Sequence, residues 1–240
     1  MPGILYLVPA SLGHSDISVA VPEGVSRIVA TLDTFIVENA KTARQYLAGL
    51  ELSTPLQQIK LLVLDEHTRP EELTVLLKPL LSGKNVGLMS EAGCPAVADP
   101  GAALVKMAHT NRIRVVPLVG PSAILLALMA SGLNGQRFAF HSYLPVNLEE
   151  RIKKIAELEK ASQALNQTEI FIEAPYRNRK LLQSLLETCR ESTLLCLATD
   201  ITLASESIAT KRINEWKSKL PEINRRPTVF LLYAGKDGNL

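Results

Sequence analysis

The chain has 240 residues, of which 47% are hydrophobic and 21% are charged. This composition is typical of a globular protein with a large core, and it excludes a disordered, collagen-like or coiled-coil chain. The 26 lysines and arginines and the 24 aspartates and glutamates leave a net charge of +2. This charge is too small for a protein that binds nucleic acid by overall charge, so RNA binding would need a local basic patch.

Metal sites, disulfides and membrane helices are not expected. The three cysteines form no CxxC pair, and the four histidines form no ligand pair with them. The longest apolar stretch, 115–130, is interrupted by two prolines and a glycine, and the N-terminus lacks the basic region of a signal peptide. We therefore expect a cytoplasmic protein with reduced thiols and without a bound metal.

Strand and helix patterns alternate over the first half of the chain. Short apolar runs bounded by turn-forming residues predict strands, and amphipathic stretches between them predict helices. The predicted strands are 4–8, 27–30, 61–64, 86–89 and 114–118, and the predicted helices are 34–50, 70–81 and 101–110. Because parallel neighbours need a crossover, this alternation predicts a parallel sheet with helices on both faces.

The second half of the chain has a similar mixture of patterns. An apolar helix runs from the Gly120 region to about residue 130. The predicted strands are 138–143, 169–172, 194–199 and 228–233, and the predicted helices between them are 149–160 and 179–189. The fold class is thus α/β, with two α/β domains that we place at 1–119 and 120–240.

Small-residue loops stand in place of the usual nucleotide-binding motifs. The chain has no GxGxxG after its first strand and no GxxxxGK[ST], so an ordinary dinucleotide site and a P-loop are disfavoured. Loops rich in Gly, Ala, Ser and Pro follow or precede predicted strands at 90–95, 119–123, 173–177 and 225–228. Each alone is explained by a plain turn or a helix cap. Together, such loops at strand ends indicate one ligand cleft.

The order of these motifs resembles the tetrapyrrole methylase family of S-adenosylmethionine-dependent methyltransferases. The resemblance is closest to the bacterial branch that methylates the ribose 2′-hydroxyl of a cytidine in small-subunit ribosomal RNA. It covers nearly the whole chain. The motifs are LYLVP at 5–9 with Gly13 and Asp16, SEAGCP at 90–95, DPG at 99–101, VPL at 116–118, GPSA at 120–123, SGL at 131–133, YLP at 143–145, EAPYR at 173–177 and RPT at 226–228.

The resemblance implies a fold, a cofactor and a set of donor-binding residues. It implies the tetrapyrrole methylase fold with the cofactor cleft between its two domains, S-adenosylmethionine as the cofactor, and a homodimer. Family members hold the donor largely through main-chain groups, which accounts for the small residues in the loops. The donor-binding residues carried over from the resemblance are Pro9, Ala10, Gly93, Cys94, Val97, Ser122, Ala123, Ala174, Pro227 and Thr228.

The acceptor side departs from the family pattern. Where the RNA-modifying branch has Glu-Asp-Thr-Arg, this chain reads ENAK at 38–41, and where that branch has His-Glu-His-Asn it reads DEHT at 65–68. The chain also ends at Leu240, without the small helical extension common in the RNA enzymes. By the resemblance, Glu38 and His67 are the catalytic candidates. The substrate-binding candidates are Lys41, Arg44, Glu66 and Arg177.

Simpler roles remain open for several of these residues. Glu38 and Lys41 also suit a solvated helix face, and His67 suits the start of a helix. Cys94 has no neighbouring base or cation that would lower its pKa, so packing or donor contact suits it better than nucleophilic attack.

Three functions fit these observations. The first is 2′-O-methylation of a ribose in small-subunit ribosomal RNA, with the subunit or its RNA as partner. The second is methylation of a small molecule such as a tetrapyrrole precursor. The third is a non-catalytic protein that retains the donor site, because the altered acceptor motifs also permit loss of catalysis.

Overall fold

The computed structural model describes residues 1–13 and 17–235, and it divides the chain into two compact units, Met1–Ser122 and Ala123–Leu240. Asp16, which contributes to the family resemblance, lies outside the described residues. The two units are described separately below.

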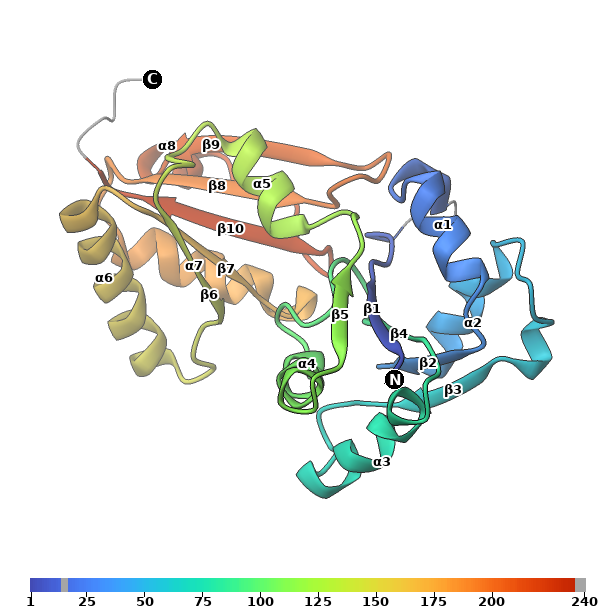
Figure 1. The fold of residues 1–240 in the computed structure, drawn as a ribbon. Coiled ribbons are helices and arrows are strands. Elements are labelled where there is room, and N and C mark those ends of the chain that lie inside the picture. Colours follow the sequence, from blue (N-terminus) through green and yellow to red (C-terminus); the bar gives the residue numbers. More distant parts are fainter. Residues whose placement is uncertain (14–16, 236–240) are drawn as a thin grey trace. The chain divides into compact units, whose positions relative to one another are not determined.

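The N-terminal unit is built around a five-stranded parallel sheet (Figure 1). Its strands are β1 (Ile4–Val8), β2 (Thr34–Val37), β3 (Lys60–Val63), β4 (Val86–Met89) and β5 (Arg114–Pro117), in the spatial order β3-β2-β4-β1-β5. Its helices are α1 (Glu23–Ala30), α2 (Ala40–Ala48), α3 (Pro70–Leu81) and α4 (Gly101–Thr110), with short 3₁₀ turns at Ile17–Val19 and Leu56–Gln58. The predicted parallel sheet is confirmed.

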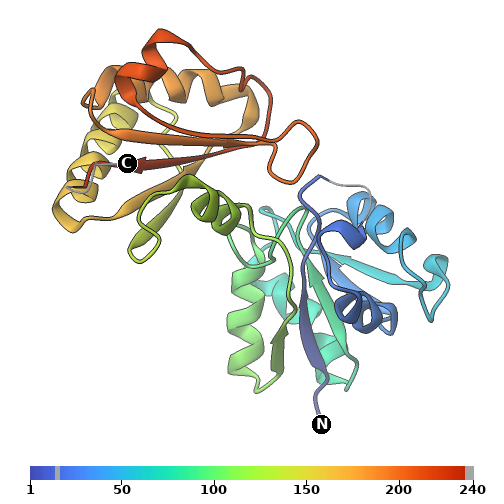
Figure 2. The ribbon, with the colours of Figure 1, turned by 90° about the horizontal axis from the view of Figure 1, so that it is seen from above.

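Helices cover both faces of this sheet (Figure 2). On one face, α1 and α2 bury Val29 and Leu47 in a core shared with Phe35 of β2. On the other face, α3 and α4 bury Leu80 and Leu104 in a second core. Each apolar side chain buried in this way contributes about 1.5–3 kcal/mol to folding. Strands buried on both faces read as continuous apolar runs, which is the pattern that the sequence shows.

Two predicted elements in this unit are wrong. Residues 27–30 form the end of α1 rather than a strand, because Val25 and Val29 are four residues apart and both are buried on one face of the helix. Residues 34–37 form β2 rather than the start of a helix. All four of their side chains are buried, because β2 is an inner strand and cores lie on both faces of the sheet. The helix that follows is accordingly shorter and begins at Ala40.

The C-terminal unit contains a five-stranded mixed sheet in the spatial order β6-β7-β10-β8-β9. Its strands are β6 (Phe138–Tyr143), β7 (Thr168–Ile172), β8 (Leu194–Thr199), β9 (Ser207–Arg212) and β10 (Thr228–Tyr233). Its helices are α5 (Ala123–Ser131), α6 (Leu148–Leu165), α7 (Asn178–Thr188) and α8 (Ile213–Ser218), with a 3₁₀ turn at Pro175–Arg177. Among the described strands of this unit, β6 and β7 pair in parallel and the other pairs are antiparallel. The sequence pattern predicts all these strands except the edge strand β9, whose residues are mostly polar or small.

The helices of this unit also lie on both faces of its sheet (Figures 1 and 2). The core beneath α6 and α7 includes Phe171 of β7 and Phe230 of β10, whose rings stack with centroids 5.8 Å apart. On the opposite face, α5 contacts β8, β9 and β10. Among residues 1–13 and 17–235, no helix combines the length and apolar character that a membrane span requires.

Candidate functional site

The carboxyl ends of the N-terminal strands carry most of the predicted site residues. Pro9 and Ala10 follow β1, Glu38 follows β2, and Glu66 lies in the loop after β3. The loop after β4 carries Gly93, and the segment after β5 ends at Ser122. Because all five strands are parallel, these loops emerge at the same edge of the sheet, which is where open α/β sheets bind ligands.

Direct contacts join the loops after β1, β4 and β5. Ala10 and Gly93 exchange two main-chain hydrogen bonds, in which each N–H donates to the other's carbonyl, at 2.9 and 3.2 Å. The Cys94 thiol lies 3.3 Å from the carbonyl oxygen of Pro121. A Cβ atom at Gly120 would lie 2.1 Å from the Cβ of Pro9, so only glycine permits this approach. The three loops therefore form one structure that depends on main-chain contacts.

The loop after β4 is strained and is held by one carboxylate. Gly93 has a φ of +70°, and Ala96 and Ala98, which carry side chains, have φ values of +66° and +59°. Each such alanine costs about 1–2 kcal/mol. The Asp99 carboxylate accepts hydrogen bonds from the N–H groups of Ala96, at 2.8 Å, and Gly101, at 2.7 Å. Strain maintained by dedicated hydrogen bonds is a common property of ligand-binding loops.

The side chains of this loop differ in exposure. Val97 is 50% exposed, although it is a large apolar residue. Cys94 is half-buried, and burial raises the pKa of its thiol. A raised pKa disfavours the thiolate, so the geometry supports packing or ligand contact for Cys94 rather than nucleophilic attack.

The predicted donor-binding residues of the C-terminal unit also lie close together. Thr228 begins β10 beside the ends of β7 and β8, and its hydroxyl lies 3.1 Å from that of Thr199. Pro227 accepts a hydrogen bond from the N–H of Asp200 at 2.9 Å. Arg225 donates its N–H to the carbonyl of Pro175, which directly follows Ala174. The segments around Ala174 and Pro227 are thus joined at one end of the sheet.

Asn178 ties the same two segments together. Its side-chain amide donates to the carbonyls of Ile223 and Arg226, at 3.1 and 2.7 Å, and the residue is fully buried. Its carboxamide oxygen finds no hydrogen-bond partner within residues 1–13 and 17–235. A buried acceptor of this kind next to a small-residue loop fits a ligand that carries a donor group.

Two further donor-binding candidates lie where the units meet in sequence. Ser122 is the last residue of the N-terminal unit, and Ala123 is the first residue of α5 in the C-terminal unit. Both are half-buried. Their side chains are small, as in the loops around Gly93 and Gly120. The residues present therefore fit a ligand that is held mainly by main-chain groups.

Glu38 occupies a partly buried, negatively charged position. Its carboxylate accepts a hydrogen bond of 3.1 Å from the N–H of Glu91 in the loop after β4. Burial is the main cause of its raised pKa, and the charges of Glu91, Asp99 and Glu66 raise it further, against the lowering effect of the Glu91 hydrogen bond. A carboxylate with a raised pKa is a better proton acceptor than an ordinary one.

Lys41 and Arg44 lie in the first turns of α2. Asn39 begins this helix as its N-cap, because its side-chain oxygen accepts the N–H groups of Lys41 and Thr42 at 2.9 and 3.3 Å. Lys41 and Arg44 are exposed and three residues apart, so they lie on the same side of the helix. Within the described part of the chain, neither forms an ion pair.

His67 and Glu66 are more exposed than the other candidates. Their side chains are 84% and 85% exposed, and 3.7 Å separates the imidazole from the carboxylate. The loop is organised by Asp65, whose carboxylate accepts the N–H of His67 and the hydroxyl of Thr68. These hydrogen bonds shape the turn that leads into α3, and they leave the His67 side chain exposed. Glu38 is therefore the stronger candidate for a base.

Arg177 is bound to a buried acid. Its guanidinium makes two contacts with one oxygen of Glu173, at 2.9 and 2.6 Å, and the Glu173 side chain is 1% exposed. Its guanidinium carbon also lies 5.5 Å from the centroid of the Tyr176 ring. The charge of Arg177 is thus largely neutralised by Glu173, so this residue is a weaker candidate for phosphate binding than Lys41 or Arg44.

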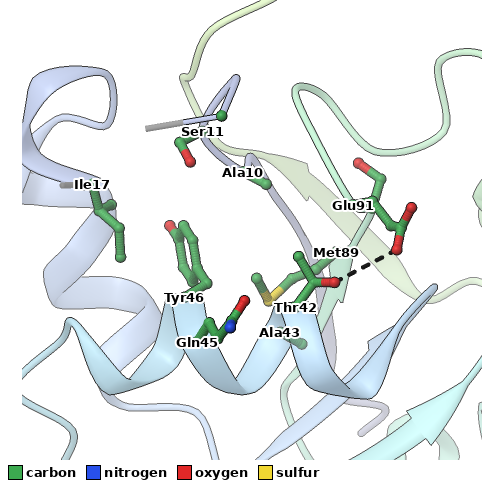
Figure 3. A pocket seen from close by; sticks show the side chains of 11 residues that line it. Ala10, Ser11, Ile17, Thr42, Ala43, Gln45, Tyr46, Met89 and Glu91 are labelled. Atoms are coloured by element: carbon green, nitrogen blue, oxygen red, sulfur yellow. Dashed lines mark hydrogen bonds between the residues drawn. The ribbon is translucent and has the colours of Figure 1, made fainter. Parts of the chain in front are cut away.

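A pocket of about 530 Å³ opens in the N-terminal unit beside these candidates (Figure 3). It is lined by Ala10, Ser11, Gly13, Ile17, Thr42, Ala43, Gln45, Tyr46, Met89, Ser90 and Glu91. From this set, the sequence analysis assigns a role only to Ala10, although Gly13, Ser90 and Glu91 lie in the family motifs. Tyr46 and Met89 also belong to the hydrophobic core of this unit, and no local signal marks their contact with a cavity. No cluster of three or more metal-ligating side chains is found among residues 1–13 and 17–235.

Comparison with known proteins identifies the family. No protein-family model matches the chain. Ribosomal RNA small subunit methyltransferase I of Vibrio cholerae is 33% identical over 238 residues, which cover 98% of this chain and 78% of that protein. The chain belongs to the ribosomal RNA small subunit methyltransferase I family. As a member of this family it is an S-adenosylmethionine-dependent methyltransferase.

Solved structures confirm the fold. The methyltransferase CobJ has a TM-score of 0.65 and 19% identity, with 96% of this chain and 94% of that one covered. A uroporphyrin-III C-methyl transferase from Thermus thermophilus, solved with S-adenosyl homocysteine, has a TM-score of 0.60 and 16% identity, with 96% and 97% covered. These likenesses confirm the tetrapyrrole methylase fold expected from the motifs. The roles of individual residues stay predictions.

Proposed function

We propose that this protein methylates the 2′-hydroxyl of a ribose in small-subunit ribosomal RNA. The observation that carries the proposal is the position of Glu38 at the carboxyl edge of the N-terminal sheet. There it accepts a hydrogen bond from the loop that leads to Gly93, and the exposed cations Lys41 and Arg44 follow on the next helix. The relative in Vibrio cholerae is named for the same RNA. Such an acceptor would place the activity in the cytoplasm.

Residues of both units would bind the methyl donor. In the N-terminal unit these are Pro9, Ala10, Gly93, Cys94, Val97 and Ser122, and in the C-terminal unit Ala123, Ala174, Pro227 and Thr228. When bound, S-adenosylmethionine supplies a methyl group activated by an adjacent sulfonium. The joined loops after β1, β4 and β5 would fix the donor's orientation, because in-line displacement requires precise alignment.

Glu38 would accept the proton that the acceptor hydroxyl loses. A ribose hydroxyl has a pKa far above neutrality, so a nearby carboxylate assists when it takes the proton as the new bond forms. The raised pKa of Glu38 improves its match to this task. The exposed His67 and its neighbour Glu66 would then contact the RNA rather than the reacting hydroxyl.

Lys41 and Arg44 would hold the RNA backbone. Both side chains are exposed, and the first turn of α2 contributes a partial positive charge at the same place. A chain with a net charge of +2 can bind a polyanion only through such a local group of cations. Arg177 would contribute less, because Glu173 neutralises it.

We also propose that the protein acts as a homodimer. Large apolar side chains are exposed in the C-terminal unit, including Met129 of α5 and Phe138 and Tyr143 of β6. Because β6 is an edge strand of its sheet, its exposed apolar side chains favour pairing with another chain. A dimer would present the cations of α2 twice.

Sedimentation equilibrium would give twice the monomer mass, and Met129→Glu would shift the protein towards monomer. A monomer at micromolar concentration would exclude the dimer.

Methyl transfer to ribosomal particles tests the proposed reaction. Small subunits from a strain without the modification would be incubated with labelled S-adenosylmethionine, next to RNA stripped of ribosomal protein. We expect label in the RNA and a 2′-O-methylated nucleoside after digestion. Label on a base would contradict the proposed chemistry. If neither particle nor RNA is labelled while calorimetry still detects donor binding, the acceptor is not ribosomal RNA.

A further inference from the structure

The pocket in the N-terminal unit has the character of a ligand site. Its 530 Å³ lies within the range of small-molecule sites, and its walls combine apolar side chains with a few polar groups. Ile17, Met89 and Ala43 provide apolar surface, and Thr42 and Glu91 provide polar groups at one side (Figure 3). The Thr42 hydroxyl lies 3.5 Å from the Glu91 carboxylate. A ligand with an apolar body and polar groups at its edge suits this lining.

Tyr46 supplies an independent indication of a ligand. Its side chain rises from α2, and its hydroxyl points toward the segment that carries Ser11 (Figure 3). The residue is only 8% exposed, yet its hydroxyl has no hydrogen-bond partner within residues 1–13 and 17–235. Buried hydroxyl groups nearly always find a partner. A hydroxyl left without one on the wall of a pocket indicates that a bound molecule provides it.

The hydroxyl is a hydrogen-bond donor at neutral pH. Burial raises the pKa of Tyr46 to about 12, so the group keeps its proton. The bound molecule must therefore present an acceptor to Tyr46, while the Glu91 carboxylate at the other side of the pocket favours a donor. Nucleobases meet both requirements, because they have flat faces, carbonyl or ring-nitrogen acceptors, and amino or imino donors.

The pocket shares its wall with the predicted donor site. Ala10 lines the pocket, and its main chain is bonded to Gly93 of the loop after β4. Glu91 also lines the pocket, and its N–H donates to Glu38, the proposed base. A nucleotide whose base entered the pocket would therefore have its ribose next to groups already implicated in methyl transfer. Enzymes that modify a nucleotide inside folded RNA often turn it out of its stack into such a pocket.

We propose that this pocket holds the unstacked base of the acceptor nucleotide, and that the Tyr46 hydroxyl donates a hydrogen bond to an acceptor atom of that base. The inference rests on the proposed function and deepens it. It makes Tyr46 a substrate-binding residue that acts on the acceptor and not on the donor. Thr42 and Glu91 would then contact the polar edge of the same nucleotide.

The variant Tyr46→Phe tests the proposal, because it removes only the hydroxyl and keeps the ring. The matched control is Tyr6→Phe, since Tyr6 is partly buried on β1 of the same unit and does not line the pocket. For each protein we would measure KM and kcat with small ribosomal subunits, the Kd for S-adenosylmethionine by calorimetry, and the melting temperature. We expect Tyr46→Phe to raise KM about three- to tenfold, the effect of losing one hydrogen bond between uncharged groups. The donor Kd should stay within about twofold, and Tyr6→Phe should change neither quantity.

Two results would overturn the proposal. If Tyr46→Phe leaves KM and kcat unchanged, the unpartnered hydroxyl has no role in acceptor binding. If it weakens S-adenosylmethionine binding as much as it raises KM, the pocket belongs to the donor. The melting temperature should not fall, because an unsatisfied buried hydroxyl is removed. A fall of several degrees with unchanged kinetics would assign Tyr46 to packing alone.

A binding measurement separates this proposal from the proposed reaction. If wild-type protein transfers no methyl group to small subunits, the proposed function fails. Binding to the pocket is then tested with cytidine at millimolar concentration by saturation-transfer NMR. A signal that appears with wild type and Tyr6→Phe but is weaker with Tyr46→Phe supports the base pocket. Absence of a signal with wild type, or equal signals from all three proteins, overturns it.

Discussion

Two groups of loops at one edge of the N-terminal sheet differ in how they are built. The loops after β1, β4 and β5 are joined by main-chain hydrogen bonds and by the close approach of Gly120 to Pro9. The segments after β2 and β3, including the first turns of α2, present charged side chains, of which Lys41 and His67 are exposed. Main-chain contacts fix the conformation of the loops after β1, β4 and β5. The segments after β2 and β3 instead present side chains that can bind RNA or accept a proton.

This difference explains which motifs match the family and which do not. A backbone structure requires small residues at fixed positions, so the segments around Gly93 and Gly120 keep the family pattern. A charged surface can be rebuilt with other residues of similar charge, so 38–41 and 65–68 can depart from it. The comparison predicts that substitutions in the two groups fail in different ways: loss of donor binding in the first, and loss of acceptor binding or catalysis in the second.

Gly120→Ala should have the largest effect. Its Cβ would lie 2.1 Å from the Cβ of Pro9, so the loops after β1 and β5 must separate. We expect S-adenosylmethionine affinity to fall more than a hundredfold in calorimetry and the free energy of unfolding to fall by about 2 kcal/mol. The control is Gly24→Ala in α1, where no atom lies within 4 Å of the added Cβ. It should be neutral or stabilising by up to about 1 kcal/mol. Unchanged donor binding in Gly120→Ala would refute the backbone interpretation.

Glu38→Gln should lower kcat about a hundredfold while leaving donor affinity unchanged. Its pKa is raised, so wild-type kcat should fall as the pH drops through that raised pKa, and this limb should be absent from the variant. A carboxyl group with a raised native pKa stabilises the fold below its unfolded pKa, and that contribution is lost as the pH rises. The variant should therefore be at least as stable as wild type at pH 7. Glu51→Gln, at an exposed position of the same unit, is the control, and an equal loss of kcat there would remove Glu38 from its proposed role.

Arg177→Ala should act on stability rather than on RNA binding. It leaves the buried Glu173 carboxylate without its partner, which costs about 3 kcal/mol and should appear in chemical denaturation. Arg179→Ala breaks an exposed pair with Glu222 and should cost less than about 1 kcal/mol. If the Arg177→Ala protein is as stable as wild type but binds RNA more weakly, Arg177 binds the substrate after all.

Replacing Lys41 and Arg44 together by alanine should have the smallest effect on the enzyme itself. RNA affinity should fall, and the slope of log affinity against log salt should decrease by up to about two, one for each lost phosphate contact. Lys60→Ala with Lys78→Ala removes two charges elsewhere in the same unit and should leave that slope unchanged. Filter binding at several salt concentrations gives the slopes. A loss of S-adenosylmethionine affinity in the first pair would contradict the division between the two groups of loops.

The sequence predicts an element correctly where its pattern fits only a helix or only a strand. Helices 70–81 and 101–110 and strand 86–89 coincide with α3, α4 and β4, because a proline, a glycine or a small-residue loop bounds them. The errors at 27–30 and 34–37 have one cause. Both are short runs with Ile and Val, and a buried helix face and a buried strand look alike over four residues. Tertiary neighbours, which no local pattern contains, decide between them.

The site is only partly predictable for a similar reason. Gly93 and Gly120 are found from the sequence because backbone geometry restricts which residue can stand there. Tyr46 is not found, because an aromatic residue on a buried helix face normally belongs to the core. What distinguishes it is that its hydroxyl has no hydrogen-bond partner in the described part of the chain, which only coordinates reveal. The pairing of Arg177 with Glu173 is local, because the two residues are four apart, but it depends on the 3₁₀ turn Pro175–Arg177, which the sequence pattern does not predict.

Asn39 has a consequence for how fast an RNA would reach this edge. It begins α2 through its side-chain oxygen, as an aspartate would, but carries no charge. An aspartate here would place one more anion next to Glu38 and within a Debye length, about 8 Å, of an arriving phosphate. Long-range attraction sets the rate of encounter between a protein and a polyanion. The neutral cap thus lets Lys41 and Arg44 attract the approaching strand without opposition from the residue that starts their helix.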